Sequence, residues 1–184
     1  YKLPVAINND ANCFALGEKV YGKGKGFQNF AALSIGTGLG MGVIINNRLY
    51  SGVMSGAGEI GMLPYKQGII EEYAGSFFFQ REYQQTAKVL NDKAMKGDAV
   101  ALKAYGEFGE HLGQAIKIIL FMYAPEAIIM GGSISKAYPF FKKVLKESLD
   151  TFDYPKQIER LELLISEEKD MPILGAASLC AGDH

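Results

Sequence analysis

Cysteine is scarce in this sequence, and the placement of the two cysteines excludes two kinds of site. Cys13 and Cys180 lie far apart among small or apolar residues, and no CxxC pair occurs. A disulfide framework and a CxxC metal or redox site are therefore excluded. We expect both cysteines to be buried thiols of a cytoplasmic protein.

A surplus of charge of either sign is also missing. The 19 lysines and arginines nearly balance the 20 aspartates and glutamates, and the net charge is -1. Because a nucleic-acid-binding surface normally needs a basic patch, we expect no nucleic-acid binding through this domain.

Long apolar runs are absent as well. The most apolar stretch, residues 115–124, is interrupted by Lys117, and it is well short of the roughly 20 residues that a membrane span requires. No targeting segment is visible, so we expect no membrane partner.

The chain opens at Tyr1 on a strand-like run over residues 3–7, which predicts a cut inside a larger protein whose missing part lies upstream.

The rest of the composition, 48% hydrophobic and 21% charged, suits one α/β domain over residues 1–184, or a large lobe of something bigger. Antiparallel strands joined by glycine turns and an Asn46-Asn47 hairpin form a meander. A uniformly apolar run predicts a buried parallel strand. We expect strands at 5–7, 30–35, 41–45, 48–50, 127–130 and 161–165, and helices at 13–22, 71–90, 136–149, 173–180 and from the Asp98 cap to Tyr123.

Two further patterns concern packing. A broad apolar stripe on the helix over 71–90 is expected to pack on the sheet, and its members are Tyr73, Phe77, Phe78 and Tyr83. A glycine stripe on the long helix should mark a close helix contact, because glycine costs helix propensity; it consists of Gly106, Gly109 and Gly113.

Glycine is abundant between residues 34 and 61, where Arg48 and Glu59 are the charged side chains. The N–H groups of the turn Gly36-Thr37-Gly38-Leu39-Gly40 can cradle phosphate oxygens, and Thr37 adds a hydroxyl. No Gly-Lys-Ser or Gly-Lys-Thr follows, and a strand rather than a helix comes next, so the turn is neither a Walker loop nor a dinucleotide fingerprint. A plain hairpin turn is the alternative.

An acidic side chain, Asp10, follows the first predicted strand, at the edge where open α/β sheets bind ligands. It can act as a general base, or it can simply cap the following helix. Glu59 lies among small residues, with Glu71 the next acidic candidate; loop carboxylates grip sugar hydroxyls through charge-assisted hydrogen bonds, or are merely solvated. Gly131 and Gly132 begin a strand-to-helix junction that suits a nucleotide or an ordinary tight turn.

The order and spacing of these motifs resemble the ROK family of bacterial sugar kinases, repressors and open reading frames. The resemblance covers nearly the whole chain and matches the carboxyl-terminal lobe. It lies in Asn9-Asp10-Ala11-Asn12 with Ala15-Leu16-Gly17-Glu18, in Ser34-Ile35-Gly36-Thr37-Gly38-Leu39-Gly40-Met41-Gly42-Val43, in Gly56-Ala57-Gly58-Glu59-Ile60-Gly61, in Ile129-Met130-Gly131-Gly132 and in Leu174-Gly175-Ala176-Ala177.

The resemblance implies an actin-like, ribonuclease H-like ATPase fold and a glucokinase-like reaction that uses ATP with Mg²⁺. Asp10 matches the catalytic aspartate, which takes the proton from the sugar hydroxyl. The sugar-binding matches are Asn9, Glu59 and Glu71, and the nucleotide-binding matches are Gly36, Thr37, Gly38, Gly131 and Gly132. A hexose or N-acetylhexosamine substrate and a homodimer are also implied.

The chain departs from the family pattern in two places. Met62 stands where most members have His, and only Gly68 and Glu71 survive of the zinc motif Cys-x-Cys-Gly-x-x-Gly-Cys-x-Glu. Because zinc needs thiolate and imidazole ligands, we predict no structural zinc and no other protein-bound metal. The amino-terminal Asp-x-Gly-Gly-Thr phosphate motif does not occur, so we expect little or no kinase activity from these 184 residues alone.

Three functions remain open at this point. The first is a sugar kinase of glucokinase type. The second is a sugar-responsive repressor whose helix-turn-helix domain lies upstream. The third is a non-catalytic sugar-binding protein, against which the presence of Asp10 argues.

Overall fold

A five-stranded mixed sheet forms the centre of the computed structural model, which describes residues 5–181. Its strands lie in the order β3 (Arg48–Leu49), β2 (Leu39–Ile45), β1 (Phe30–Ile35), β6 (Ala127–Gly131) and β7 (Glu162–Ile165). The first three are antiparallel, and β6 and β7 run parallel to β1. The predicted meander and the predicted buried parallel strand are both confirmed.

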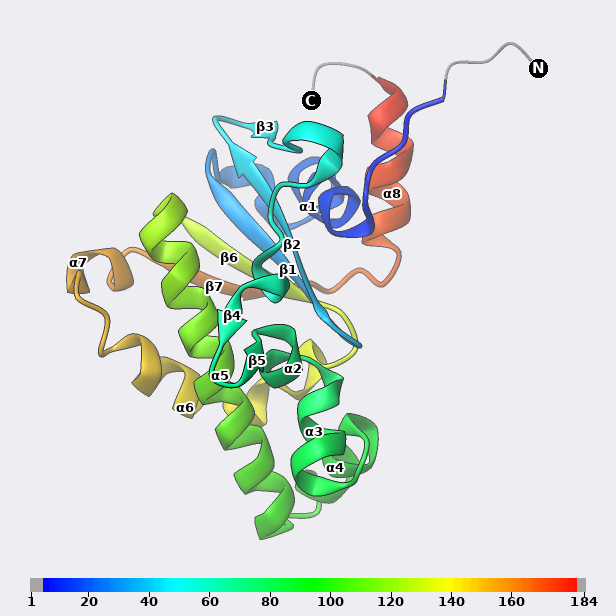
Figure 1. Cartoon of the computed structure of the whole chain (residues 1–184). Helices are drawn as coiled ribbons and strands as arrows, with labels where there is room; N and C mark the ends of the chain where they lie inside the picture. The colour runs from blue at the N-terminus through cyan, green and yellow to red at the C-terminus, as the bar shows by residue number, and fades with distance from the viewer. Residues whose placement is uncertain (1–4, 182–184) are drawn as a thin grey trace.

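Helices cover both faces of this sheet (Figure 1). One face carries α1 (Asp10–Val20) and α8 (Met171–Ser178), and the other carries α5 (Ala99–Tyr123) and α6 (Tyr138–Leu149). The shorter elements are α2 (Glu71–Ala74), α3 (Ser76–Tyr83), α4 (Ala87–Ala94), α7 (Pro155–Ile158), the hairpin of β4 (Pro64–Tyr65) and β5 (Gly68–Ile69), and the 3-10 turns η1 (Lys23–Gly26), η2 (Val53–Ser55), η3 (Ile60–Met62), η4 (Ser135–Ala137) and η5 (Leu179–Ala181).

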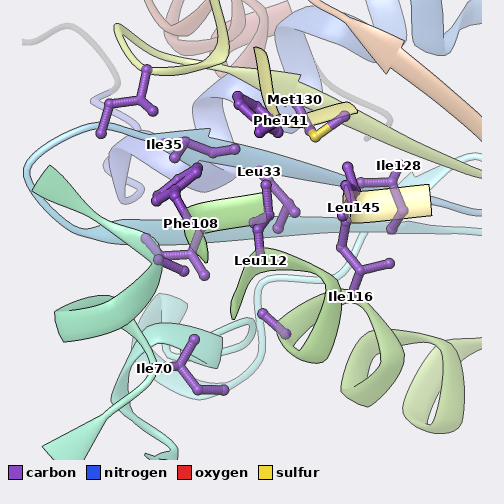
Figure 2. Close-up of a cluster of buried hydrophobic side chains, with 14 of the residues drawn as sticks. Leu33, Ile35, Ile70, Phe108, Leu112, Ile116, Ile128, Met130, Phe141 and Leu145 are labelled. Carbon is purple, nitrogen blue, oxygen red and sulfur yellow. The ribbon is translucent and has the colours of Figure 1, made fainter. Parts of the chain in front are cut away.

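The side chains of β1 divide the core in two. Leu33 and Ile35 point to the α5 and α6 side, where Figure 2 shows them beside Phe108, Phe141 and Leu145. Phe30 and Ala32 face α1 and α8 instead. Because both faces of β1 and β6 are covered, these strands are apolar except at Ser34, as parallel strands buried on both faces usually are.

Local signals placed several boundaries correctly. Asp98 caps α5, since its Oδ1 accepts a hydrogen bond of 2.8 Å from the N–H of Ala101. Asn46 and Asn47 turn the β2–β3 hairpin with φ values of 52° and 65°. Gly109 lies against the backbone of Phe141 and Gly113 against the side chain of Ser148, so the glycine stripe on α5 marks a close contact with α6.

The expected strand over residues 5–7 is wrong. Val5 and Ile7 are 81% and 88% exposed, and no strand of the described residues lies beside them. An apolar pattern predicts a strand only where a partner strand is within reach. Leu3 and Pro4, which belong to the same predicted run, lie outside the described residues.

The single helix expected over 71–90 is also wrong. Gly75 is extended (φ -130°) and Gln84 is left-handed (φ 53°), so the segment divides into α2, α3 and the start of α4. Its apolar stripe packs on α5 rather than on the sheet: the ring of Phe78 contacts that of Phe108, whereas Phe77 is half exposed.

Cys13 is buried, as expected, but Cys180 is exposed. Cys180 lies in η5, the last turn of the described chain. The prediction was wrong there because a short apolar sequence does not indicate which side of the turn faces solvent. No helix among residues 5–181 is long and apolar enough to cross a membrane.

Close contact between α1 and α8 depends on glycine, and this generates a prediction. A Cβ added at Gly175 would overlap the carbonyl oxygen of Cys13 and lie 2.7 Å from the N atom of Gly17. Gly175→Ala should therefore lower the free energy of unfolding by about 1–3 kcal/mol, as overpacking does, measured by urea denaturation. The matched control is Gly26→Ala, whose added Cβ meets no atom within 4 Å. Equal stability of the two variants would show that this packing is not tight.

Candidate active site

Seven of the nine predicted site residues line one cavity, which we call the site cavity. It has a volume of about 360 Å³ and lies where β1 ends and α1 begins. Its predicted members are Asn9, Asp10, Gly36, Thr37, Gly38, Glu59 and Glu71, and the other lining residues are Ala11, Ser34, Leu39, Gly40 and Met41.

Gly131 and Gly132 line a neighbouring cavity of about 310 Å³. Ser34 lines both cavities, so the two spaces meet at the end of β1. Sequence reasoning assigned no role to Ser34 or to Lys136, which lines the neighbouring cavity. Only their places in the sequence could have indicated that they line these cavities: Ser34 precedes the glycine turn, and Lys136 follows the Gly131-Gly132 junction.

A larger cavity, of about 690 Å³, contains none of the predicted site residues. It is lined by Phe27, Glu126, Glu162 and neighbouring residues, and lies at the amino-terminal ends of β6 and β7. Open α/β sheets bind ligands at the carboxyl ends of their strands, so we place the chemistry in the two smaller cavities.

Asn9, rather than Asp10, is the N-cap of α1. The Oδ1 of Asn9 accepts a hydrogen bond of 2.7 Å from the N–H of Asn12, and its Nδ2 donates one of 2.8 Å to the carbonyl of Ser55. The carboxylate of Asp10 is exposed and accepts from the N–H of the adjacent Ala11. Asp10 is therefore not needed as the cap, and within residues 5–181 its Oδ2 accepts no hydrogen bond.

The first residue of α3 donates two hydrogen bonds to the turn from Gly36 to Gly38. The N–H of Ser76 donates to the carbonyl of Gly36 at 2.9 Å, and its hydroxyl donates to the carbonyl of Thr37 at 3.4 Å. Within residues 5–181, the N–H groups of Thr37 and Gly38 donate to no other backbone group. Two adjacent backbone donors are thus available for an anion.

Glu71 connects this turn with the segment that carries Glu59. A Cβ added at Gly38 would overlap the Oε2 of Glu71, and one at Gly61 would lie 3.3 Å from the same atom. Glycine at both positions makes room for the carboxylate. Glu71 therefore lies between the phosphate-type turn and the Gly58–Gly61 segment.

Two other buried groups near the site are structural. Burial, with the nearby carboxylate of Asp10, raises the pKa of the Cys13 thiol, so this cysteine is a poor nucleophile. Glu18 is buried, and its carboxylate accepts hydrogen bonds from the hydroxyl of Ser166 and the N–H of Lys23. The described part of the chain holds no group of three or more His, Cys, Asp or Glu side chains placed to bind a metal ion.

Comparison with known proteins shows which family the chain belongs to. The ROK family model matches residues 1–182. The chain belongs to the ROK family. Its mixed α/β architecture is the actin-like ATPase fold of ROK sugar kinases.

The relatives of the chain include both regulators and enzymes. It is 34% identical to a xylose repressor of Bacillus spizizenii, over 97% of the chain and 51% of the repressor. It is 31% identical to a glucokinase of Halalkalibacterium halodurans, over 90% of the chain and 59% of the enzyme. The chain thus spans about half to three fifths of the length of these curated relatives.

The chain is also similar to a solved structure that contains ligands. The ROK family glucokinase of Streptomyces griseus, in complex with glucose and AMPPNP, has a TM-score of 0.83 and 25% identity. The match covers 96% of this chain and 68% of that one.

Asn9 makes two hydrogen bonds that its substitution would remove, and this generates a prediction for stability. Asn9→Ala should lower the free energy of unfolding by about 1–2 kcal/mol, because a helix cap is lost together with the bond to Ser55. Thr86→Ala is the matched control, since Thr86 caps α4 away from the site cavity. Urea denaturation measures both variants. No loss of stability in Asn9→Ala would contradict the capping role.

Proposed function

We propose that the protein containing this chain is a sugar kinase that transfers the γ-phosphate of ATP to a hexose, with Asp10 as general base. The observation that supports this most is the content of the site cavity. Asp10 lines the same cavity as two kinds of group: the backbone donors of Thr37 and Gly38, which suit phosphate, and the carboxylates of Glu59 and Glu71, which suit sugar hydroxyls.

In the proposed reaction, Asp10 accepts the proton of a sugar hydroxyl, by resemblance usually that on carbon 6. The sugar oxygen then forms a bond to the γ-phosphorus of ATP, the bond to the β-phosphate oxygen breaks, and ADP leaves. Phosphoryl transfer depends mainly on positioning and charge neutralisation. Mg²⁺ would arrive with ATP and would neutralise phosphate charge.

The nucleotide is assigned across the two cavities. Thr37, Gly38 and the neighbouring Gly36 would face its phosphates, and Gly131 and Gly132 its adenosine. Both of the latter glycines also have packing reasons to be glycine: a Cβ at Gly131 would meet the ring of Phe14, and Gly132 has a φ of 87° against the backbone of Ile35. Their assignment is therefore supported by their position in the neighbouring cavity and not by residue type.

The sugar is assigned to Asn9, Glu59 and Glu71, and its class to hexoses or N-acetylhexosamines. The Streptomyces griseus relative holds glucose. Both polar atoms of the Asn9 amide already bond to the protein, so its second amide hydrogen and second lone pair remain for a hydroxyl. We further propose that residues 1–184 are the carboxyl-terminal lobe of a two-lobed, homodimeric cytoplasmic enzyme, and that this domain binds no nucleic acid.

A sugar-responsive repressor is the second candidate, and the 34% identity to a xylose repressor favours it. The same cavity would then bind the inducing sugar. A helix-turn-helix in the sequence upstream of Tyr1 would favour the repressor. A non-catalytic sugar-binding protein would have less need of a base at Asp10.

Asp10→Asn separates the kinase from the other candidates. In the product of the complete reading frame, we expect kcat to fall by about 10²–10⁴-fold, as for loss of a general base, while the Kd for the sugar changes little. A coupled assay for ADP release measures kcat, and calorimetry measures Kd. We use the complete product because little or no turnover is expected from the 184 residues alone.

The matched control is Asp98→Asn, because Asn caps a helix about as well as Asp and Asp98 lies at the start of α5, outside both cavities. Its turnover should equal that of the parent protein. Unchanged turnover in Asp10→Asn would remove Asp10 from the mechanism.

A second prediction concerns metal. The segment from Met62 to Glu71 contains no Cys or His, so purified protein should contain far less than one zinc ion per chain by elemental analysis, and EDTA should leave its thermal unfolding unchanged. Stoichiometric zinc would contradict this.

A further inference from the structure

The segment that connects Glu59 to Glu71 forms a small hairpin. The strands β4 and β5 pair Pro64 with Ile69 and Tyr65 with Gly68. The N–H of Ile70 also donates to the carbonyl of Leu63 at 3.0 Å. We call residues 63–70 the site hairpin. Two-residue strands are too short to be stable without packing against something else, so the position of this hairpin depends on what it contacts.

The site hairpin contacts α5 through a cluster of four rings: Tyr65, Tyr73, Phe78 and His111. The Oη of Tyr65 lies 3.1 Å from the Nδ1 of His111. The ring of His111 lies with its centroid 5.2 Å from that of Tyr73 and 5.3 Å from that of Phe78, edge to face in both cases. His111 is only 8% exposed. One partly buried polar contact in an aromatic cluster thus joins the hairpin to the helix.

The surroundings of the cluster keep both groups of this contact uncharged. Burial lowers the pKa of His111, and Lys66 and Arg81 lower it further, whereas Glu110 and Glu107 act in the opposite direction. Burial also raises the pKa of Tyr65. Near neutral pH the imidazole is therefore uncharged and the tyrosine hydroxyl protonated, so the contact is a hydrogen bond between two neutral groups, and the tautomer of His111 sets which of them donates.

The same cluster reaches the beginning of α2. Tyr73 lies two residues after Glu71, its ring centroid is 5.2 Å from that of Tyr65, and its hydroxyl donates to the Oε1 of Gln67 at 3.2 Å. The guanidinium of Arg81 lies 4.2 Å from the centroid of the Tyr73 ring, within the range of a cation–π contact. The hairpin and the helix turn that begins with Glu71 are thus held as one unit.

We propose that Tyr65 and His111 are positioning residues that hold Glu59 and Glu71 in place for the sugar. This inference rests on the proposed function, because it takes the sugar to lie against these two glutamates. Neither Tyr65 nor His111 lines the site cavity, so they act through the hairpin and not by touching the substrate.

Tyr65→Phe tests this in the product of the complete reading frame. It removes one hydroxyl, and the Kd for sugar should rise about five- to tenfold, the range that corresponds to the loss of one buried hydrogen bond. The KM for ATP and kcat should change less than twofold. Calorimetry with D-glucose, D-xylose and N-acetyl-D-mannosamine measures Kd, and hydrogen exchange should accelerate in residues 59–71.

Tyr105→Phe is the matched control. It also removes a hydroxyl that makes one partly buried hydrogen bond, to the carbonyl of Ala87 at 2.8 Å, but Tyr105 lies outside the four-ring cluster and does not contact the hairpin strands through that bond. His111→Gln offers an amide oxygen to Tyr65 and should keep more sugar affinity than His111→Ala.

Three results would overturn the proposal. One is a Kd for Tyr65→Phe equal to that of Tyr105→Phe. Another is an equal rise in the KM for ATP, which would indicate a general loss of structure. The third is no binding of any of the three sugars to the parent protein, which would also overturn the proposed sugar site. A parent protein that binds sugar without phosphorylating it would disprove the kinase alone, and the comparison of Kd values would still decide the role of Tyr65.

Discussion

The parallel pairing of β1 with β6 is the constraint on which the rest of the molecule depends. It joins segments about a hundred residues apart and aligns Ser34 with Gly131 at the carboxyl ends of the two strands. The turn at Gly36 and the junction at Gly132 therefore begin side by side, and the N–H of Ile134 donates to the carbonyl of Ile35 across them. The burial of both strands on both faces stabilises this pairing, so the two cavities share a rigid wall.

Close approach of α1 to β2 brings Asp10, the proposed general base, to that wall. A Cβ at Gly42 would lie 2.6 Å from the Cβ of Ala15 and overlap the backbone of Ala11, and one at Gly40 would lie 3.1 Å from the Cβ of Ala11. The glycines of the meander thus have two different roles. Those at 36 and 38 shape a turn, whereas those at 40 and 42 let the start of α1, and with it Asp10, lie directly on the strand.

Much of this could be predicted from the sequence because the signals are local. Asp98 at the start of α5 and the Asn46-Asn47 turn each depend on a few neighbouring residues, and the structure shows both. The motif order likewise pointed to the residues that now line one cavity.

The errors have a common physical origin in contacts between distant parts of the chain. Residues 71–90 have the apolar spacing of one helix, but Ser76 bonds to the turn at Gly36, and Gly75 must be extended to allow it. The strand predicted at 5–7 needed a partner that no local pattern can reveal. The contact of His111 with Tyr65 could not be predicted either, because the residues around a single histidine in an apolar helix do not indicate what it contacts.

Charge in the site cavity has a consequence for how phosphate is held. Asp10, Glu59 and Glu71 line it, and among the described lining residues none is a lysine or arginine. Carboxylates repel an anionic phosphate and suit a neutral polyol, so the sugar fits this cavity without further help. A phosphate would be held here by uncharged donors, the backbone N–H groups and the hydroxyl of Thr37, against three negative side chains.

Positive charge for the phosphates therefore has to come from outside this set of residues. Lys136 and Lys169 line the neighbouring cavity, but Glu167 and Glu168 line it too, so the charged lining residues there balance in number. A cation bound to the nucleotide would compensate the carboxylates at the point where the phosphoryl group moves, and electrostatic compensation at that point is what phosphoryl transfer requires. The same charge pattern would let a regulator bind a sugar in this cavity without a nucleotide.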